Sequence, residues 1–290
     1  MVLTRDADPA RRSGSGDAGS RTVRYAHWTP NGETGAWARE IDAADALVNL
    51  AGAGIADKRW TAARKRILWN SRIQSTKSLI SALRTVARRP SVLIQGSAAG
   101  YYGSFENGPT IDETSPPGSD FLAQLCVAWE GEAQAAASVG CRLVITRSSV
   151  VLSRDGGALP RMMLPFTLFA GGPIGSGRQI MSWIHLDDWI EMVLWAIEKS
   201  SVSGPINLAA PEPVTSAEFS RALGRAMNRP SWLPVPGFAL RLIVGELAND
   251  ALLRGHRILP KRAQELGYVF RHPGVDEALV SAVRRLSDPR

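Results

Sequence analysis

The sequence predicts an α/β fold in which a doubly wound parallel sheet is followed by a smaller, mainly helical C-terminal lobe. Strand-like apolar runs alternate with helical stretches up to residue 210, which is the pattern of a parallel sheet covered by helices on both faces. From Pro211 onward, prolines and helical stretches continue without this alternation. The chain has 290 residues, enough for one large domain with a lobe. We therefore expect a sheet domain over 1–210 and a lobe over 211–290.

The expected elements follow one another in the order that such a sheet requires. Short apolar runs predict strands at 1–4, 23–27, 46–50, 92–95, 143–147 and 206–208. Longer stretches predict helices at 60–87, 121–137 and 189–198. In the first of these helices, one buried face is predicted for Ile73, Ile80, Leu83 and Ala87.

Composition and charge narrow the class of protein. The chain carries 34 Lys and Arg against 27 Asp and Glu, a formal net charge of +7. Only five of these bases are lysines, and the arginines are scattered without a basic face interleaved with aromatic residues. Because a nucleic-acid-binding protein should show such a face and a recognisable module, we expect an arginine-rich solvated surface and no nucleic-acid partner.

The chain also lacks the signals of membrane insertion and secretion. No apolar run approaches the roughly 18 residues that a membrane span needs, and no secretory signal follows Met1. Cys126 and Cys141 have neither disulfide nor zinc spacing. We expect free thiols, a reducing cytoplasmic location and no membrane partner.

Candidate site residues lie where the predicted strands end, since open α/β sheets bind ligands outside the carboxyl ends of their strands. The strand at 46–50 runs into Asn-Leu-Ala-Gly-Ala-Gly, whose small residues would let a ligand approach the backbone or would simply form a tight turn. The strand at 92–95 ends in Gln-Gly-Ser-Ala-Ala-Gly-Tyr-Tyr-Gly. Later runs of this kind are Arg-Ser-Ser-Val-Val-Leu at 147–152 and Trp-Ile-His-Leu-Asp-Asp at 183–188.

Taken in this order, with Gly-Gly-Pro-Ile-Gly-Ser-Gly at 171–177, these motifs resemble the extended short-chain dehydrogenase/reductases. The resemblance is to their epimerase-like branch, also called SulA-like or sugar-nucleotide epimerase-like, and it covers nearly the whole chain. The C-terminal domain of unknown function in that branch is matched by Leu-Pro-Val-Pro at 233–236, Gly-Glu at 245–246 and Leu-Pro-Lys-Arg at 259–262. The family implies a Rossmann-like fold that binds NADP(H).

The resemblance implies a cofactor role for particular residues. Arg5 follows the strand that reaches the adenosine ribose, where an arginine suits the 2′-phosphate of NADP better than the 2′-hydroxyl of NAD. The alternative for Arg5 is a solvated loop cation. By resemblance, the other cofactor contacts are Thr4, Leu50, Ala51, Arg72 and Val151. For Arg72 the alternative is an ordinary surface residue of a helix.

The first departure from the family concerns the cofactor phosphates. The Gly-x-x-Gly-x-x-Gly loop that holds the pyrophosphate is absent where it should lie. Residues 1–5 resemble the second strand of the family, so we expect an N-terminally truncated reading frame that lacks the first strand and the glycine loop. The glycines of 171–177 do not replace it, because no strand precedes them and no helix follows. We place them in a 156–177 excursion on the substrate side.

The second departure concerns catalysis. Enzymes of this superfamily use Tyr-x-x-x-Lys, in which the lysine lowers the pKa of the tyrosine so that it exchanges protons near neutrality. The sequence contains no Tyr-x-x-x-Lys. The two positions fall on Cys126 and Glu130 or, one residue earlier, on Leu125 and Trp129.

Several side chains could substitute for the missing pair, and each has a structural alternative. Ser97 occupies the place of the catalytic Ser or Thr of the superfamily, or caps a strand end. Glu130 would be an acid facing the nicotinamide, or a solvated helix residue. Tyr101 and Tyr102 would supply a phenol or pack under their loop. His185 with Asp188 would orient a proton donor or hold the lobe junction, and Cys126 would be a buried apolar residue.

Two functions therefore stay open at this level. The first is an NADP(H)-dependent oxidoreductase or epimerase that acts on an unidentified small molecule. The second is a non-catalytic cofactor-binding or regulatory protein. An inactive truncated product is a third possibility. The apolar side chains of the lobe would either cap a substrate cleft or pack on a second subunit in a homodimer.

Overall fold

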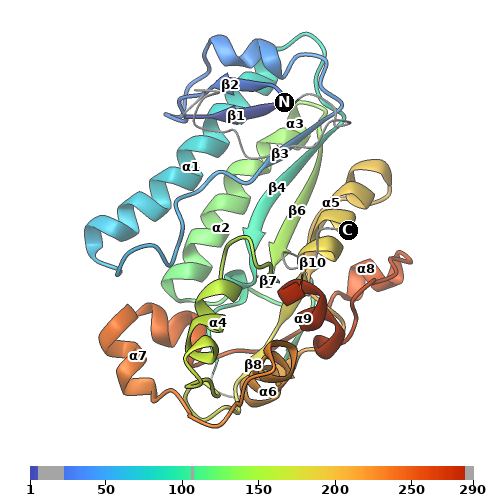
Figure 1. The fold of residues 1–290 in the computed structure, drawn as a ribbon. Coiled ribbons are helices and arrows are strands. Elements are labelled where there is room, and N and C mark those ends of the chain that lie inside the picture. The colour runs from blue at the N-terminus through green and yellow to red at the C-terminus, as the bar shows by residue number, and fades with distance from the viewer. Residues whose placement is uncertain (6–22, 106–107, 285–290) are drawn as a thin grey trace.

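The computed structural model describes residues 1–5, 23–105 and 108–284. Its centre is a parallel sheet in the order β10-β6-β4-β3 (Figure 1), and all three neighbouring pairs in it run parallel. The strands are β3 (Ala46–Asn49), β4 (Val92–Ala98), β6 (Arg142–Ser148) and β10 (Gly204–Leu208). The predicted α/β class and parallel sheet are confirmed.

A second parallel pair, β1 (Val2–Thr4) with β2 (Tyr25–His27), forms a separate sheet. Leu3 of β1 and Leu47 of β3 pack against the same apolar cluster. In a doubly wound sheet one central strand would lie between these two edges, and no strand of the described residues pairs there.

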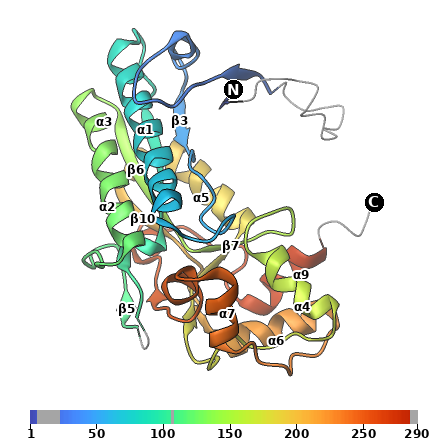
Figure 2. The same ribbon diagram turned by 90° about the vertical axis from the view of Figure 1, so that its left-hand side faces the viewer.

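Helices cover both faces of the larger sheet (Figures 1 and 2). On one face lie α1 (Ala62–Thr85), α2 (Phe121–Ala133) and the short α3 (Ala135–Ser138), behind the 3₁₀ helix η2 (Ala36–Glu40). On the other face, α5 (Leu186–Glu198) packs on β4, β6 and β10 through Met192, Val193 and Ala196. The single helix predicted over 121–137 is divided at Gln134.

Local chemistry fixes the starts of the two helices nearest the site. The Thr61 hydroxyl accepts from the Arg64 N–H and begins α1, and the Asp120 carboxylate accepts from the Ala123 N–H and begins α2. Such caps satisfy backbone donors that have no partner within the helix. Strand β4 is buried from Val92 to Ser97 and leads into the 3₁₀ helix η3 (Ala99–Tyr102).

The C-terminal lobe is built from more of the chain than residues 211–290. Its core joins α4 (Leu159–Thr167) to α6 (Ser216–Met227) and α9 (Val275–Arg284). The remaining elements are α7 (Gly237–Val244), the π-helical turn η4 (Ala248–Leu252) and α8 (Lys261–Glu265). Helix α8 returns to the sheet domain, where Ala263 joins the core beneath α5. The 156–177 excursion thus contributes a helix to the lobe.

Short paired strands tie the two parts together. They are β7 (Val150–Leu152) with β9 (Trp183–His185), β8 (Ile180–Met181) with β11 (Val214–Thr215), and β5 (Thr110–Ile111) with β12 (Arg257–Ile258). In the part of the chain that the structure describes, no helix is both long and apolar enough to cross a membrane.

Candidate functional site

Three buried polar side chains meet where β4 and β6 end. The Ser97 hydroxyl donates to Glu130 Oε1 over 2.6 Å. Arg147 donates from Nε to Glu130 Oε1 over 3.0 Å and from Nη2 to Oε2 over 2.8 Å. The side chains of Arg147 and Glu130 are only 5% and 8% exposed. Because Ser97 is the register partner of Arg147 across the sheet, strand pairing itself brings these groups together.

The surroundings of Arg147 hold it as a cation. Burial opposes the charged guanidinium, but the hydrogen bonds and the charge of Glu130 outweigh this, so the pKa of Arg147 lies above its usual range. Its guanidinium lies 3.4 Å from the Tyr101 ring centroid, which is a close cation–π contact. Its Nη1 donates to the Tyr102 hydroxyl over 3.1 Å. Ser97, Glu130 and Arg147 thus form one buried, hydrogen-bonded centre.

Tyr101 and Tyr102 both contact the guanidinium group of Arg147. The Tyr102 hydroxyl donates to Asn207 Oδ1 over 2.7 Å, and burial raises the pKa of Tyr102 to about 12. Asn207 in turn donates to the Leu259 carbonyl, and its backbone N–H donates to Glu113. The packing alternative for Tyr102 therefore agrees with its position, since the phenol is buried and fully hydrogen-bonded.

The two candidate registers for the missing pair face different partners. Trp129 donates from Nε1 to the Thr76 hydroxyl, inside a buried polar group under β3. Glu130 faces Ser97, and Cys126 interacts with Ser97 as well. Burial, with the charge of Glu130, raises the pKa of the Cys126 thiol to about 12. In the first register the two positions hold a thiol and a carboxylate, and in the second they hold the side chains of Leu125 and Trp129.

Four of the predicted cofactor residues lie at or just after the ends of strands. Thr4 ends β1, and Arg5 follows it with an exposed side chain. Leu50, which is 55% exposed, and Ala51 follow β3. Val151 lies on the half-buried part of β7.

Arg72 lies beneath the loop that follows β3. Its Nη1 donates to the carbonyls of Ala53 and Leu68, and its guanidinium lies 5.1 Å from the Trp129 ring centroid. A side chain at Gly52 would place its Cβ 2.9 Å from the Arg72 guanidinium carbon. A larger residue at position 52 would therefore push the Arg72 side chain aside where the loop crosses it. Arg72 supports the loop whether or not it also reaches a ligand.

Asp188 and the glycine-rich run 171–177, two other candidates from the sequence, make contacts that hold the backbone in place. The Asp188 carboxylate accepts from the N–H groups of Arg271 and His272 at 2.7 and 2.9 Å, which agrees with the lobe-junction alternative. In the glycine-rich run, Gly171 accepts from the N–H groups of Trp232 and Leu233, and a Cβ at Gly172 would strike the Leu233 carbonyl. These glycines allow two backbone segments to approach closely.

The functional residue that the motifs did not single out is Arg147. It stands at the start of the Arg-Ser-Ser-Val-Val-Leu motif. The signal was present in the sequence, because an arginine inside the apolar run 143–147 must be buried and therefore paired.

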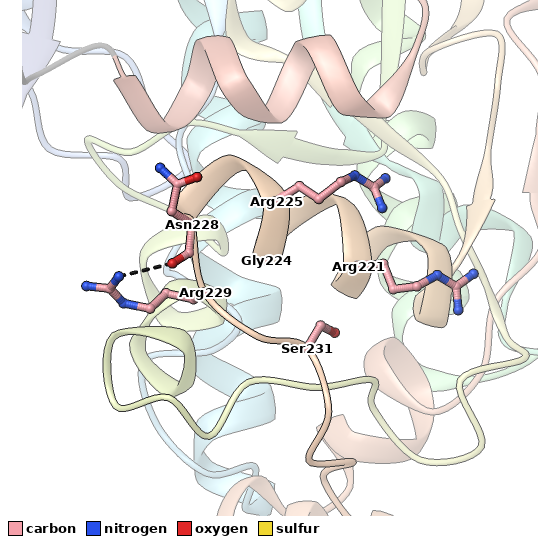
Figure 3. Close-up of a pocket in the computed structure, with 6 residues that line it drawn as sticks. All are labelled: Arg221, Gly224, Arg225, Asn228, Arg229 and Ser231. Carbon is pink, nitrogen blue, oxygen red and sulfur yellow. Dashed lines mark hydrogen bonds between the residues drawn. The ribbon is translucent and has the colours of Figure 1, made fainter.

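A surface hollow in the lobe does not make a second candidate site. It is lined by Arg221, Gly224, Arg225, Asn228, Arg229 and Ser231 (Figure 3). The guanidinium groups of Arg221 and Arg229 point to opposite sides of the hollow. Arg225 is paired with Asp276. The cations therefore do not converge on one ligand.

Comparisons with known proteins agree with this architecture. Residues 2–209 match the NAD dependent epimerase/dehydratase family, and residues 235–282 match a domain of unknown function, DUF1731. The chain is 44% identical over 260 residues to epimerase family protein Mb2239 of Mycobacterium bovis, covering 89% of this chain and 85% of that protein. It is 43% identical over 249 residues to the chloroplastic epimerase family protein SDR39U1 homolog of Arabidopsis thaliana, covering 85% and 71%.

A solved structure gives the same result in three dimensions. The human epimerase family protein SDR39U1 (isoform 2) with NADPH matches with a TM-score of 0.84 and 30% sequence identity, over 98% of this chain and 90% of that chain. Both the sequence and the fold thus match over most of the length. The chain therefore belongs to the NAD dependent epimerase/dehydratase family.

Proposed function

We propose that the protein is an NADP(H)-dependent oxidoreductase or epimerase that acts on a small molecule, with Ser97 as the group that contacts the substrate. The observation that carries this proposal is the buried Glu130–Arg147 pair directly behind Ser97. A charged pair costs free energy when it is buried, and here it orients a hydroxyl at the carboxyl end of two parallel strands, where such folds bind ligands.

The residues at the strand ends fit the cofactor. Arg5 offers an exposed cation after β1 for a 2′-phosphate, and Ala51 and Gly52 allow close approach after β3. Bound NADP(H) would supply or accept a hydride. The NADPH in the related human protein supports the phosphorylated form of the cofactor.

The hydrogen bond to Glu130 determines which hydrogen bonds the Ser97 hydroxyl can make with a substrate. Its proton points to Glu130 Oε1, so its remaining lone pairs can accept a hydrogen bond from a substrate hydroxyl. When the substrate is oxidised, its hydroxyl proton would pass to Ser97 while the Ser97 proton passes to Glu130. In this proposal Glu130 acts through Ser97. Arg147 holds the carboxylate in place through both of its oxygens.

A second candidate function is cofactor binding without catalysis. The observation in its favour is Cys126, which stands where the family has its catalytic tyrosine. Burial raises the pKa of this thiol to about 12, which makes it an inefficient acid–base catalyst near neutrality. In that case bound NADP(H) would stabilise the protein, and the surface of the lobe would serve a second subunit in a homodimer. Neither candidate involves nucleic acid or a membrane span.

An activity assay with matched variants separates the two. NADPH absorbance is followed with secondary alcohols plus NADP⁺ and with carbonyl compounds plus NADPH. Epimerisation, which changes no net NADPH, is followed by chromatography of the substrate, and NADPH affinity is measured in parallel by fluorescence. We expect turnover that Ser97→Ala and Glu130→Gln each reduce by about 10²-fold or more, with NADPH affinity unchanged. Ser138→Ala, an exposed serine on α3, is the control and keeps full turnover. Binding without turnover favours the second candidate, and no binding of either NADPH or NADH contradicts both.

A further inference from the structure

We propose that His185, Asp187 and His272 form a binding site for one zinc-class divalent metal ion that joins the sheet domain to the lobe. One ligand atom from each of these residues lies within 4.8 Å of the other two. Asp187 Oδ2 lies 3.6 Å from His185 Nδ1 and 3.9 Å from His272 Nε2. The two imidazole rings lie with their centroids 4.0 Å apart and their planes tilted by 40°.

The fold brings these residues together from distant parts of the sequence. His185 ends β9 and is the N-cap of α5, and Asp187 lies in the first turn of that helix. His272 comes from the segment before α9. Asp188 holds that segment against α5, because its carboxylate accepts from the backbone N–H of His272 at 2.9 Å. Asp188 thus fixes the backbone that carries one ligand, as supporting groups do around metal sites.

The donor atoms are in the right chemical state for a metal. His185 Nδ1 accepts from the Asp187 N–H over 3.1 Å, so this nitrogen carries a lone pair and the ring proton is on Nε2. His272 Nε2 is buried and, within the described residues, has no hydrogen-bond partner. A metal ion would bind His272 Nε2 and so give this nitrogen a partner. At His185 Nδ1 the metal ion would replace the hydrogen bond from the Asp187 backbone N–H.

The spacing suits a small ion with nitrogen ligands. In tetrahedral zinc sites with metal–ligand distances of about 2.0–2.1 Å, neighbouring ligand atoms lie about 3.4 Å apart. Two of the observed separations exceed this by a few tenths of an ångström, which side-chain rotation can remove. Two imidazoles and one carboxylate favour zinc over calcium or magnesium, which prefer oxygen ligands.

Burial indicates a structural role for the ion. The side chains of His185, Asp187 and His272 are 1%, 15% and 14% exposed, so the ion would be shielded by protein and keep about one position for water. It would clamp the segment before α9 to the start of α5. It lies outside the Ser97 centre, so its presence does not depend on the function proposed for that centre.

Metal titration of the untagged protein tests the site. The metal-free protein is titrated with Zn²⁺ by calorimetry, and with Co²⁺, whose visible absorption reports tetrahedral nitrogen and oxygen ligands. We expect one ion per chain and a melting temperature raised by roughly 5 °C at saturating Zn²⁺. His272→Gln and Asp187→Asn should each weaken binding at least about tenfold.

Two controls make the result specific. His27→Gln removes an exposed histidine of β2, and Glu191→Gln removes an exposed carboxylate of α5 that is paired with Arg271. Both should bind Zn²⁺ as the unaltered protein does. If Asp187→Asn does not fold, His272→Gln decides alone, because its ring lies on a loop. The proposal is overturned if Zn²⁺ does not bind at a concentration of about 0.1 mM. It is also overturned if His272→Gln binds Zn²⁺ with unchanged affinity.

Discussion

Arg147 donates hydrogen bonds to both carboxylate oxygens of Glu130, and both side chains are almost completely buried. Removing one partner of such a pair leaves an uncompensated charge in the interior. We therefore expect Arg147→Met to lower the free energy of unfolding by about 3–5 kcal/mol. Urea unfolding followed by tryptophan fluorescence measures this loss.

The double variant Arg147→Met with Glu130→Leu provides the control for this prediction. It removes both charges, and apolar replacements of a buried pair are often nearly neutral. The double variant should therefore be more stable than Arg147→Met alone. If the double variant loses as much free energy of unfolding as Arg147→Met and Glu130→Leu added together, the two residues do not stabilise the fold as a pair.

The end of β1 should determine which form of the cofactor is preferred. Arg5→Ala removes the exposed cation that follows this strand, so we expect NADPH affinity to fall at least about tenfold, with NADH affinity unchanged. Fluorescence titration with the two cofactors measures the ratio. Arg24→Ala, an exposed arginine before β2, is the matched control. An equal loss for both cofactors would show that Arg5 does not contact the 2′-phosphate.

Cys126 should be chemically inert in the folded protein. Only the thiolate reacts with alkylating agents, and a pKa of about 12 leaves Cys126 as the thiol throughout the neutral range. Since a raised thiol pKa means that reactivity appears only as the pH approaches that value, iodoacetamide at pH 8 should leave Cys126 unmodified. Mass spectrometry of the folded and the urea-unfolded protein measures this, and rapid alkylation of the folded protein at pH 8 would contradict the assigned environment.

Much of the larger sheet could be predicted from the sequence because its strands are buried on both faces. Runs such as Val92-Leu-Ile and Leu143-Val-Ile are continuously apolar, and both form the strands expected of them. The two-residue pairs β8 with β11 and β5 with β12 were not predicted, since two residues carry no periodicity. They form because distant segments meet, and tertiary contacts decide where they lie.

The candidate site was predicted only in part, for a related reason. Ser97 and Glu130 were each identified, but the hydrogen bond between them depends on how α2 packs against β4. Arg147 becomes their partner because β4 and β6 pair in the register that sets Ser97 opposite Arg147. Strand register is a property of the assembled sheet. A motif read along the chain therefore supplies the residues of a site without their partners.

Asp188 provides the sharpest test of how the lobe is held to the sheet domain. It is fully buried, and its carboxylate accepts from the N–H groups of Arg271 and His272. Asp188→Asn keeps the shape but replaces one acceptor oxygen with an NH₂ donor, which would face a backbone donor. We expect a loss of about 1–3 kcal/mol in the free energy of unfolding.

The same change should act locally before the protein unfolds as a whole. Hydrogen exchange followed by mass spectrometry should show faster exchange in residues 268–274, because one of the two backbone donors there loses its acceptor. Asp276→Asn is the matched control, since Asp276 pairs with Arg225 on the exposed surface of the lobe, where ion pairs contribute little. Unchanged exchange over 268–274 in Asp188→Asn would mean that apolar packing, and not this carboxylate, holds the segment against α5.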